Sequence, residues 1–538
     1  MSTTTYPIPE VLPGTLQLFV QDGGHLRDQE ITLTPPPTTS PNDPLNWSPW
    51  RKYWHATLVL FITGLTAATS NSAGAAGDGM LEELGIHYSV ANTAAGVLFL
   101  GIGYWTLLAS PMPWLYGRRI QYLISLGFSI IGLAWFANIQ GVQDSIWCQL
   151  FVGASEGCAE ALAQLSLSDL FFQHQRGSVL GVYILATSVG TFLGPLVSGY
   201  IAADAWRWVG WTGLIISAAT LVTFYFGLEE TAFHREAILG RHLGGQPVET
   251  LADEKKDDKG QLDARGSTDS DTIPMDRRRT YRERIALITP APNMIGTGFK
   301  QYFHRLFHTL RVFTFPAVIY SGLQWGAQDA WLTFYLTVEE DNYYGPPWNY
   351  SNSAVAIMNV PTLIGAAIGC VYGGWFSDVF VRWMAKRPGR NGISEAEDRL
   401  WLMFASAFIN PAGLMLFGIS SSKGAAWPAP YVGLGMIGFG FGCAGDLSMA
   451  YLMDAYPDMV LEGMVGVAVI NNTLACLFTF TTSYWIEASG LADTFIAIGV
   501  LSFVFQMTTV PMMIWGKACR RWTYQRYQRF LYLRDGEQ

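Results

Sequence analysis

The sequence predicts an all-α membrane protein with twelve transmembrane helices in two pseudo-symmetric six-helix bundles. Half of its 538 residues are hydrophobic and 14% are charged, against about 25% charged residues in an average soluble domain. Apolar runs of about 20 residues, the length that crosses a bilayer core, recur along the chain. A long polar interruption separates the sixth run from the seventh, which indicates two halves.

The runs define an order of segments. Residues 1–50 are polar and rich in Pro and Thr, so we expect a disordered cytoplasmic tail without a signal peptide. The first bundle, residues 51–228, is expected to hold spans at 53–76, 91–112, 119–140, 145–170, 178–202 and 207–228. The second bundle, residues 312–516, is expected to hold spans at 312–338, 352–377, 400–420, 429–453, 464–487 and 491–515. Residues 517–538 then form a basic cytoplasmic tail.

Residues 229–311 are expected to form a cytoplasmic linker between the bundles. The stretch Asp253–Asp271 is charged and poor in apolar residues, so it cannot bury enough surface to fold alone. A basic run, Arg277–Arg279, follows it. Such a run is also compatible with nucleic acid. Beside so many spans, however, we expect it to lie at anionic membrane lipid, with no nucleic-acid partner.

The charges of the loops predict the topology. With both termini in the cytoplasm, Lys and Arg gather in the inner loops, as the positive-inside rule requires. The outer loops carry acids instead, from Asp78 and Glu82 to Glu339. We therefore expect a multi-pass protein of the plasma membrane. The sequon that begins at Asn349 falls in an outer loop, where a glycan would be attached, although many such sequons go unused.

The fifth span, Gly181–Gly199, has no charges and many glycines. On a helix, Gly190, Gly194 and Ser198 form a stripe of small residues, which lets two helix backbones approach closely. Pro195 cannot donate a backbone hydrogen bond to Thr191, so a bend is expected there. The stripe fits a mechanical, gating helix, and it fits a plain packing helix equally well.

This span also carries a resemblance. The pattern Gly181, Gly190, Gly194-Pro195 and Gly199 resembles the fifth-helix signature of proton-coupled antiporters in the major facilitator superfamily. The segment Asp43–Ser48 resembles the sequence before the first helix of many fungal members. The resemblance implies the superfamily's fold, alternating access between the two halves, and the branch of fungal drug:proton antiporters.

Two loops repeat a motif in matching places of the two halves. After the second span, the sequence ends in the superfamily-like Gly117-Arg118-Arg119, although Trp114 stands where the motif has Asp. After the eighth span, the matching residues are Gly374, Asp378 and Arg382. The resemblance implies a gating role for these loops. Asp378 could accept hydrogen bonds from neighbouring helix N-termini, and the alternative is a basic anchor with one capping acid.

The fourth span carries a polar stripe at spacings of three and four, formed by Gln149, Gly153, Glu156, Glu160 and Gln164. A charge near the bilayer centre costs at least ~2.5 kcal/mol, so such acids face a cavity, a partner or a proton path. We expect Glu160 and Glu156 to carry protons, and the two glutamines to contact substrate. The alternative is a neutral Glu that is satisfied by hydrogen bonds between helices. Many drug antiporters have an Arg where Gln149 stands, so their proton relay does not carry over whole.

Two further spans offer candidate substrate-binding groups. In the seventh span, Gln324, Trp325, Gln328 and Asp329 interrupt an apolar run, and amide and aromatic groups that face inward would bind an organic substrate. Asp329 would lie instead at the outer mouth under the alternative interpretation. In the tenth span, Asp446 follows a glycine-rich run and is expected to line the same cavity.

The leading hypothesis is a proton-coupled exporter of a small organic molecule such as a drug, toxin or secondary metabolite. The alternatives are a proton-coupled importer of a nutrient or organic cation such as a polyamine, and a non-transporting membrane sensor. An enzyme is not expected, because the sequence shows no nucleophile–base or metal-ligand constellation. We expect no cofactor and no metal, and a monomer whose partners are the substrate, protons and lipid.

Overall fold

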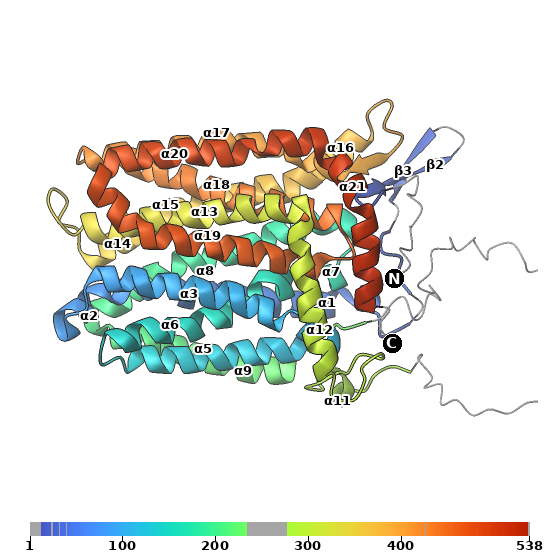
Figure 1. The fold of residues 1–538 in the computed structure, drawn as a ribbon, viewed down its shortest axis with the longest axis horizontal. Coiled ribbons are helices and arrows are strands. Elements are labelled where there is room, and N and C mark those ends of the chain that lie inside the picture. The colour runs from blue at the N-terminus through green and yellow to red at the C-terminus, as the bar shows by residue number, and fades with distance from the viewer. Residues whose placement is uncertain are drawn as a thin grey trace, which may run out of the picture.

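The computed structural model describes residues 12–22, 25–31, 33–38, 40–233, 277–425 and 427–535. It is an elongated bundle of helices that run along its length, with both termini at one end (Figure 1). The charged stretch Asp253–Asp271 of the expected linker lies outside the described residues, as do the first eleven residues of the expected tail.

The first half consists of thirteen short and long helical segments in chain order. They are η1 (Pro44–Asn46), α1 (Pro49–Asn71), η2 (Gly74–Ala76), α2 (Gly77–Leu84), α3 (Tyr88–Ala109), α4 (Met112–Leu115), α5 (Arg118–Ala137), α6 (Val142–Gly157) with the π-helical η3 (Cys158–Leu162) and α7 (Ala163–Leu170), η4 (Gln173–Gln175), α8 (Arg176–Ala205) and α9 (Arg207–Gly227). The spans are α1, α3, α5, α6 to α7, α8 and α9, in the predicted order.

The second half repeats this plan after the linker helices. Its segments are α11 (Tyr281–Arg284), α12 (Phe299–Thr309), η5 (Leu310–Thr314), α13 (Pro316–Asn342), α14 (Asn352–Ile357), α15 (Asn359–Val371), the π-helical η6 (Tyr372–Phe376), α16 (Ser377–Ala385), η7 (Ala396–Leu402), α17 (Met403–Ser422), α18 (Ala429–Ala455), α19 (Val460–Ser489), α20 (Leu491–Met507) and α21 (Thr509–Asp535). Its six spans are α13, α14 to α16, α17, α18, α19 and α20, which continues into the start of α21.

Ten helical spans of the described chain are long and apolar enough to cross a membrane. The two other spans, α6 to α7 and α13, are more polar, and they run the same length of the bundle (Figure 1). Together they give the all-α, twelve-span membrane fold that the sequence predicts. The two polar spans are those in which the sequence places Glu156, Glu160 and Asp329.

The two halves meet along several spans. Helix α3 of the first half packs along α19 of the second, and α8 packs along α14, α15 and α18. Glycines permit close packing within the halves as well: a Cβ on Gly365 of α15 would lie 1.9 Å from the backbone oxygen of Gly435 in α18. Most residues of α18 are buried, so this helix forms the core of the second half.

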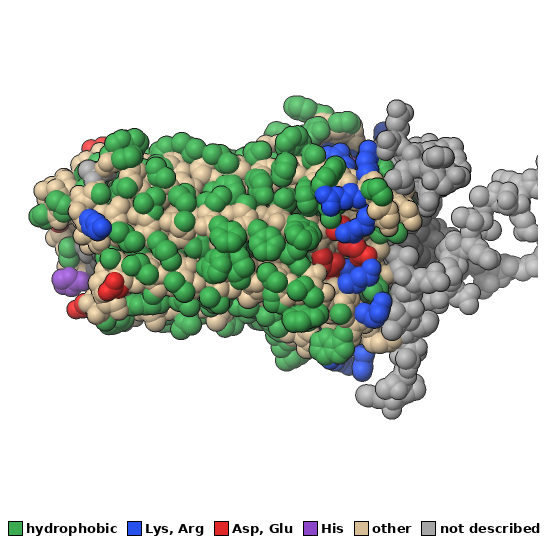
Figure 2. Space-filling view, turned by 90° about the horizontal axis from the view of Figure 1, so that it is seen from above, with side chains coloured by type: hydrophobic (Ala, Val, Ile, Leu, Met, Phe, Trp, Pro, Cys, Tyr) green, Lys and Arg blue, Asp and Glu red, His purple; other side chains and the backbone are tan. Residues whose placement is uncertain are grey.

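The charges are divided between the two ends of the bundle. Hydrophobic side chains cover most of the face seen in Figure 2, and Lys and Arg gather at the end that carries the termini. We call this the basic end, and it contains the buried residues Arg118, Arg119, Arg176, Arg399 and Arg520. The opposite end carries helix α2, in which Glu83 pairs with Arg207.

The segment before the first span differs from the expected disordered tail. Strand β1 (Thr15–Gln17) pairs antiparallel with β4 (Ile393–Glu395) of the second half, with Thr15 opposite Glu395. Strands β2 (Phe19–Asp22) and β3 (His25–Ile31) form a hairpin. Nearer the first span, the carboxylate of Asp43 accepts hydrogen bonds from Thr38 and from the backbone of Leu45, which starts η1.

The linker and the C-terminal tail are partly helical. Helix α12 crosses the spans near the basic end, and α21 turns across the same end after α20 (Figure 1). The carboxylate of Glu397 pairs with Arg520 of α21, which ties α21 to η7. The expected tail 517–538 is thus helical up to Asp535.

Candidate functional site

The fourth span places two glutamates inside the bundle. Gly153 lets α6 pack against α3, because a Cβ there would lie 2.2 Å from the backbone oxygen of Leu98. Beyond this contact, Glu156 and Glu160 are only 8% and 9% exposed. Glu160 lies in the π-helical turn η3, a departure from regular helix that is frequent at functional sites. The hydroxyl of Tyr183 on α8 donates to a backbone oxygen in this turn.

An aspartate from the other half lies beside these glutamates. The carboxyl of Asp329, on α13, is close enough to those of Glu156 and Glu160 for the three to repel one another. Asn471 of α19 lies beside both Glu160 and Asp329. Ser70 of α1 lies beside Glu156. We call Glu156, Glu160 and Asp329 the carboxyl cluster, and four spans from both halves meet at it.

The carboxyl cluster has no basic partner in the described part of the chain. The ion pairs of the bundle lie near its ends, and none includes Glu156, Glu160 or Asp329. A buried charge without a partner is strongly unfavourable. The cluster therefore suits two kinds of ligand, protons and a cation.

The two glutamines of the predicted stripe extend this polar track. Gln149 and Gln164 are both buried, on either side of the two glutamates along the fourth span. Each has a side-chain oxygen with no hydrogen-bond partner among the described residues. The sequence pattern thus marks a continuous polar strip inside the bundle.

The glutamines of the seventh span lie elsewhere. Gln324 donates to the backbone oxygen of Phe505 at 2.8 Å, and Gln328 accepts from the side-chain amide of Asn410 at 2.7 Å. Both interactions hold α13 to other spans of the second half. The structure therefore brings Asp329 to the carboxyl cluster and directs the two glutamines into the packing of the second half.

Trp325 belongs to a row of aromatic rings that joins the halves. Its ring centroid lies 4.7 Å from that of Phe441 on α18, and Phe441 lies 5.7 Å from Phe192 on α8. Gly445 makes room for the indole, because a Cβ there would lie 2.3 Å from the ring. The row places an apolar wall between α8, α13 and α18.

Asp446 lies at the contact between the halves and is fully buried. Neither oxygen of its carboxyl has a hydrogen-bond partner among the described residues. A Cβ on Gly181 of α8 or on Gly374 of η6 would lie 3.0 Å from its Oδ2. The charged groups nearest to it are Arg399 and Asp378. The structure therefore places Asp446 between the glycines of α8 and η6, towards the basic end.

At the basic end, a group of five residues that we call the latch ties α8 to the second half. Its members are Arg176, Ser178, Asp378, Arg399 and Asp454. Asp378 Oδ2 accepts hydrogen bonds from the backbone nitrogen and the hydroxyl of Ser178, each at 2.7 Å. Its Oδ1 pairs with Arg399 at 2.9 Å, and both side chains are 3% exposed.

The remaining latch contacts reach the end of α18. Arg399 also pairs with Asp454 at 2.7 Å. Arg176, from α8, donates to the backbone oxygen of Met453 at 2.6 Å and lies 3.7 Å from the Asp454 carboxylate. Among the described residues, Arg382, the cation expected beside Asp378, donates to the Asp378 backbone oxygen and not to its carboxylate. The sequence analysis identified neither Arg399 nor Asp454 as a partner of Asp378, because the motif gives no sign of partners so distant in sequence.

The matching loop of the first half, Gly117–Arg119, does not contact the second half through the groups described next. Gly117 has a φ of 99°, and a Cβ there would lie 2.5 Å from a carboxylate oxygen of Glu230. That carboxylate accepts from the backbone nitrogens of Arg118 and Arg119 at the start of α5. The Arg118 side chain pairs with Asp169 at the end of the fourth span. These contacts lie within the first half and the residues that directly follow α9, so the two loops have different partners.

The small-residue stripe of the fifth span faces α1. A Cβ on Gly190 would lie 2.1 Å from the backbone oxygen of Gly64, and one on Gly194 would lie 2.7 Å from the Cα of Ala68. Pro195 lies inside α8, which continues unbroken past it, and Gly199 is buried. The predicted close approach of two backbones is thus observed between α8 and α1.

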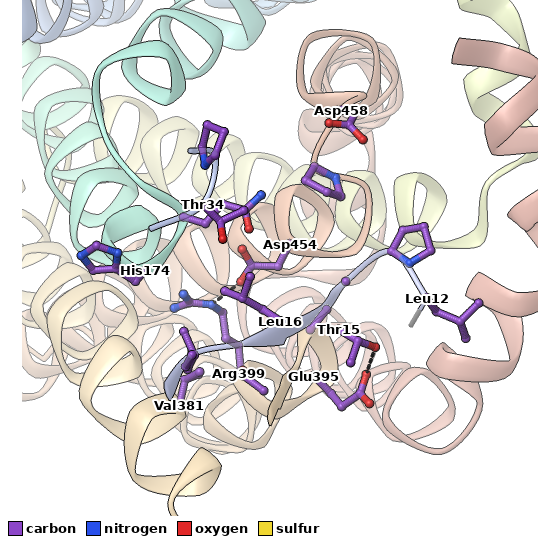
Figure 3. Close-up of a pocket in the computed structure, with 18 of the residues that line it drawn as sticks. Leu12, Thr15, Leu16, Thr34, His174, Val381, Glu395, Arg399, Asp454 and Asp458 are labelled. Atoms are coloured by element: carbon purple, nitrogen blue, oxygen red, sulfur yellow. Dashed lines mark hydrogen bonds and ion pairs between the residues drawn. The ribbon is translucent and has the colours of Figure 1, made fainter. Parts of the chain in front are cut away.

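A cavity of about 390 Å³ opens at the basic end beside the latch. Figure 3 shows Leu12, Thr15 and Leu16 from the N-terminal segment beside Arg399, Asp454 and Glu395 of the second half. We call the described residues between 12 and 38 the strap. They contact both halves, because the Gly14 oxygen accepts from the backbone of Ala396 while the Thr34 oxygen accepts from that of Gln173.

Asn349 lies in the loop between α13 and α14, at the end opposite the termini. Its side chain is exposed and its φ is 48°. The sequon is therefore accessible on the face where the topology prediction requires it.

Comparisons with known proteins identify the family. The sequence profile of the Major Facilitator Superfamily matches residues 57–478. An uncharacterized MFS-type transporter of Schizosaccharomyces pombe is 50% identical, with 98% of this chain and 95% of that protein covered. Protein HOL1 of Saccharomyces cerevisiae is 49% identical, with 98% of both chains covered.

More distant likenesses agree on the fold. A probable drug/proton antiporter of Saccharomyces cerevisiae is 24% identical over 86% of this chain and 82% of its own length. The structure of the proton:xylose symporter XylE superimposes with a TM-score of 0.54 at 13% identity, covering 85% of this chain and 96% of that one. At this identity the superposition shows the fold alone.

Proposed function

Because this chain belongs to the Major Facilitator Superfamily and is a membrane transporter by that membership, we propose that it carries a small organic cation by alternating access, coupled to protons. The observation that supports this is the carboxyl cluster. Three acids from two halves converge inside the bundle, and no described basic residue neutralises them.

The chemistry follows from electrostatics in a medium of low dielectric constant. Three carboxyls that repel one another are stabilised when protons or a cation neutralise them. In this proposal an ammonium group of the cation binds at Glu160 and Asp329, and Asn471, which lies beside both, supplies a further polar contact. Because protons and a cation would occupy the same oxygens, binding of one displaces the other.

The latch is the structural basis of alternating access in this proposal. It joins the halves at the basic end, which we assign to the cytoplasm because cytoplasmic loops are rich in Lys and Arg. The structure then represents a state closed to the cytoplasm. Both termini lie on that side, and we place the protein in the plasma membrane as single copies.

Export by proton exchange is the first candidate direction. An antiporter requires that protons and substrate compete for the same site, and the carboxyl cluster would provide such a site. In addition, the glycine–proline pattern of α8 resembles that of antiporters. Protons arriving from outside would displace the cation outwards, and the substrate would be a cationic drug, toxin or secondary metabolite.

Import of a cationic nutrient such as a polyamine is the second candidate. The membrane potential, negative inside, draws a cation inward by about 2.3 kcal/mol per charge and 100 mV. The two relatives that are about half identical do not carry antiporter names, and a relative that carries one is only 24% identical. This weakens the argument from the α8 pattern for export.

The experiment uses purified protein in proteoliposomes with an imposed pH gradient. Flux of labelled spermidine and of a cationic dye is measured in both directions for the wild type and for Glu160→Gln. We expect the variant to lose proton-driven flux while it keeps the elution profile and unfolding temperature of the wild type. The matched control is Glu83→Gln, which lies at the opposite end of the bundle, away from the cluster.

Unchanged proton-driven flux in Glu160→Gln would contradict the role of the cluster. Transport of neutral or anionic compounds with no transport of cations would contradict the substrate class. Binding without any flux in the wild type would indicate a sensor instead of a transporter.

A further inference from the structure

Helix α12 exposes one apolar face that no other described element covers. Phe299, Phe303 and Phe307 recur every four residues, so they lie on the same side of the helix. Their exposed fractions are 68%, 43% and 67%, and Leu310 continues the row just after the helix. For a surface in water, such a row of aromatic side chains would be highly unfavourable.

The helix is fixed at a definite depth beside the bundle. The hydroxyl of Tyr302, on another side of α12, donates to the backbone oxygen of Leu108 near the end of α3. Leu108 itself is half exposed on the outside of the bundle. Figure 1 shows α12 crossing the spans near the basic end instead of running along them. The phenylalanine row therefore lies where the apolar band of the spans ends.

The charge around α12 is strongly positive. Residues 277–314 contain eight Arg or Lys and one acid, Glu283. Arg278, Arg282, Lys300 and Arg311 are exposed. Each basic residue close to an anionic leaflet contributes about 1 kcal/mol of attraction.

From these observations we propose that α12 lies in the plane of the membrane at the basic end and binds anionic phospholipid. Phe299, Phe303 and Phe307 enter the boundary between acyl chains and headgroups, and Lys300 and Arg311 contact the lipid phosphates. This is the arrangement of an interfacial amphipathic helix. The proposal does not depend on the transported substrate or on its direction.

The position has a structural consequence. Helix α12 continues through η5 into α13, which carries Asp329, and Tyr302 ties α12 to α3 of the first half. Bound lipid therefore contacts a segment that connects the two halves at the basic end (Figure 1).

The test measures the environment of α12 with spin labels. The label is a nitroxide on Phe307→Cys, in protein reconstituted in phosphatidylcholine/phosphatidylserine vesicles. The background carries Cys519→Ser, because the five other cysteines are buried and should not react. We measure how often the label collides with oxygen, which dissolves in lipid, and with a water-soluble nickel chelate. Two reference labels are measured in the same way: Ile215→Cys, on the outside of a span, and Arg278→Cys, in the basic run. We expect the Phe307 label to favour oxygen, as the Ile215 label does.

A label that collides with the nickel chelate as freely as the Arg278 label would overturn the proposal. Protection from both reagents would do the same, and would indicate that protein, such as a second copy, covers the helix. A second measurement tests the headgroup. Phosphatidylserine should raise the unfolding temperature of the wild type relative to pure phosphatidylcholine. Lys300→Gln/Arg311→Gln should lose that shift, and an equal shift in the variant would refute selectivity for anionic lipid.

Discussion

Asp378 of α16 accepts two hydrogen bonds from Ser178 of α8, from its backbone nitrogen and from its hydroxyl, each 2.7 Å long. One carboxylate oxygen of the second half thus binds the first turn of a helix in the first half. The other oxygen pairs with Arg399, so the contact is buried and charge-assisted.

The first prediction is that Asp378→Asn opens the basic end. Loss of one partner from a buried ion pair costs about 3–5 kcal/mol when the other charge is left unpaired. Arg399 keeps its second pair with Asp454, so we expect a cost below that range. We expect the variant to populate a state in which α8 and η6 separate. Alkylation of the buried Cys370, whose backbone oxygen faces Gly181 across this contact, should then accelerate in peptide-mapped mass spectrometry.

Arg382→Gln is the control for this measurement. Its guanidinium donates to the backbone oxygen of Asp378 and not to the carboxylate, so labelling of Cys370 should stay near the wild-type rate. Equal rates in the wild type and Asp378→Asn would show that the latch does not hold the basic end closed.

The second prediction concerns the packing of α8 on α1. A Cβ on Gly190 would lie 2.1 Å from a backbone oxygen of α1, which cannot move without displacing the helix. Gly190→Val should therefore lower the free energy of unfolding by about 1–3 kcal/mol or more, as overpacking does. Thermal unfolding in detergent measures it.

Gly127→Ala provides the matched control. Gly127 also lies inside a spanning helix, but a Cβ there meets no atom within 4 Å. Because alanine favours a helix over glycine, this variant should be neutral or stabilised by up to about 1 kcal/mol. A Gly190→Val protein as stable as Gly127→Ala would contradict the close approach.

The sequence predicted the twelve spans because membrane helices carry their signal locally, in about 20 consecutive apolar residues. It also predicted the burial of Glu156 and Glu160, since polar residues at spacings of three and four share one face of a helix. The π-helical turn at Glu160 was missed, because nothing in the run Cys158–Leu162 distinguishes it from regular helix.

The contacts at the basic end could not be predicted for a different reason. Thr15 pairs with Glu395 across 380 residues, and Asp378 meets Ser178 across 200. Such pairs depend on how the two halves assemble, and a local pattern contains no information about it. The partners of the α13 side chains likewise depend on neighbouring helices. Gln324 and Gln328 form hydrogen bonds to other spans of the second half, and the sequence of α13 alone does not indicate this.

The third prediction is that Gly14→Val releases the strap. Gly14 has a φ of 86°, and a Cβ there would lie 2.9–3.2 Å from atoms of Arg520, Ala455 and Asp454. A branched side chain is strained at this φ and has no room. Because the backbone of Ala396 donates to the Gly14 oxygen, hydrogen–deuterium exchange in residues 393–396 should accelerate.

Gly85→Val controls for backbone strain alone. Gly85 also has a positive φ, 67°, but it ends α2 in the first half and meets no atom within 4 Å. Exchange in residues 393–396 should stay at the wild-type rate. If Gly14→Val also leaves that exchange unchanged, strand β1 does not protect β4.

The fourth prediction is a pH dependence at Glu395, which lies outside the spans. Burial alone would raise the pKa of its carboxyl, but hydrogen bonds from Lys517, Arg520 and Thr15 outweigh burial and hold the pKa below its ordinary value. The folded state therefore binds this proton less tightly than the unfolded chain. The stabilisation is present above the unfolded pKa of about 4.3 and is lost as the pH falls through the lower folded pKa. The unfolding temperature of the wild type should exceed that of Glu395→Gln at pH 7, and the difference should shrink in acid.

Glu283→Gln is the control for this measurement. Its carboxyl is exposed and its pKa is lowered mainly by hydrogen bonds from Thr280, so the variant should change the unfolding temperature little at either pH. A difference between the wild type and Glu395→Gln that stays constant from pH 7 to a pH well below the unfolded pKa would mean that the carboxylate gains nothing from its two cationic neighbours.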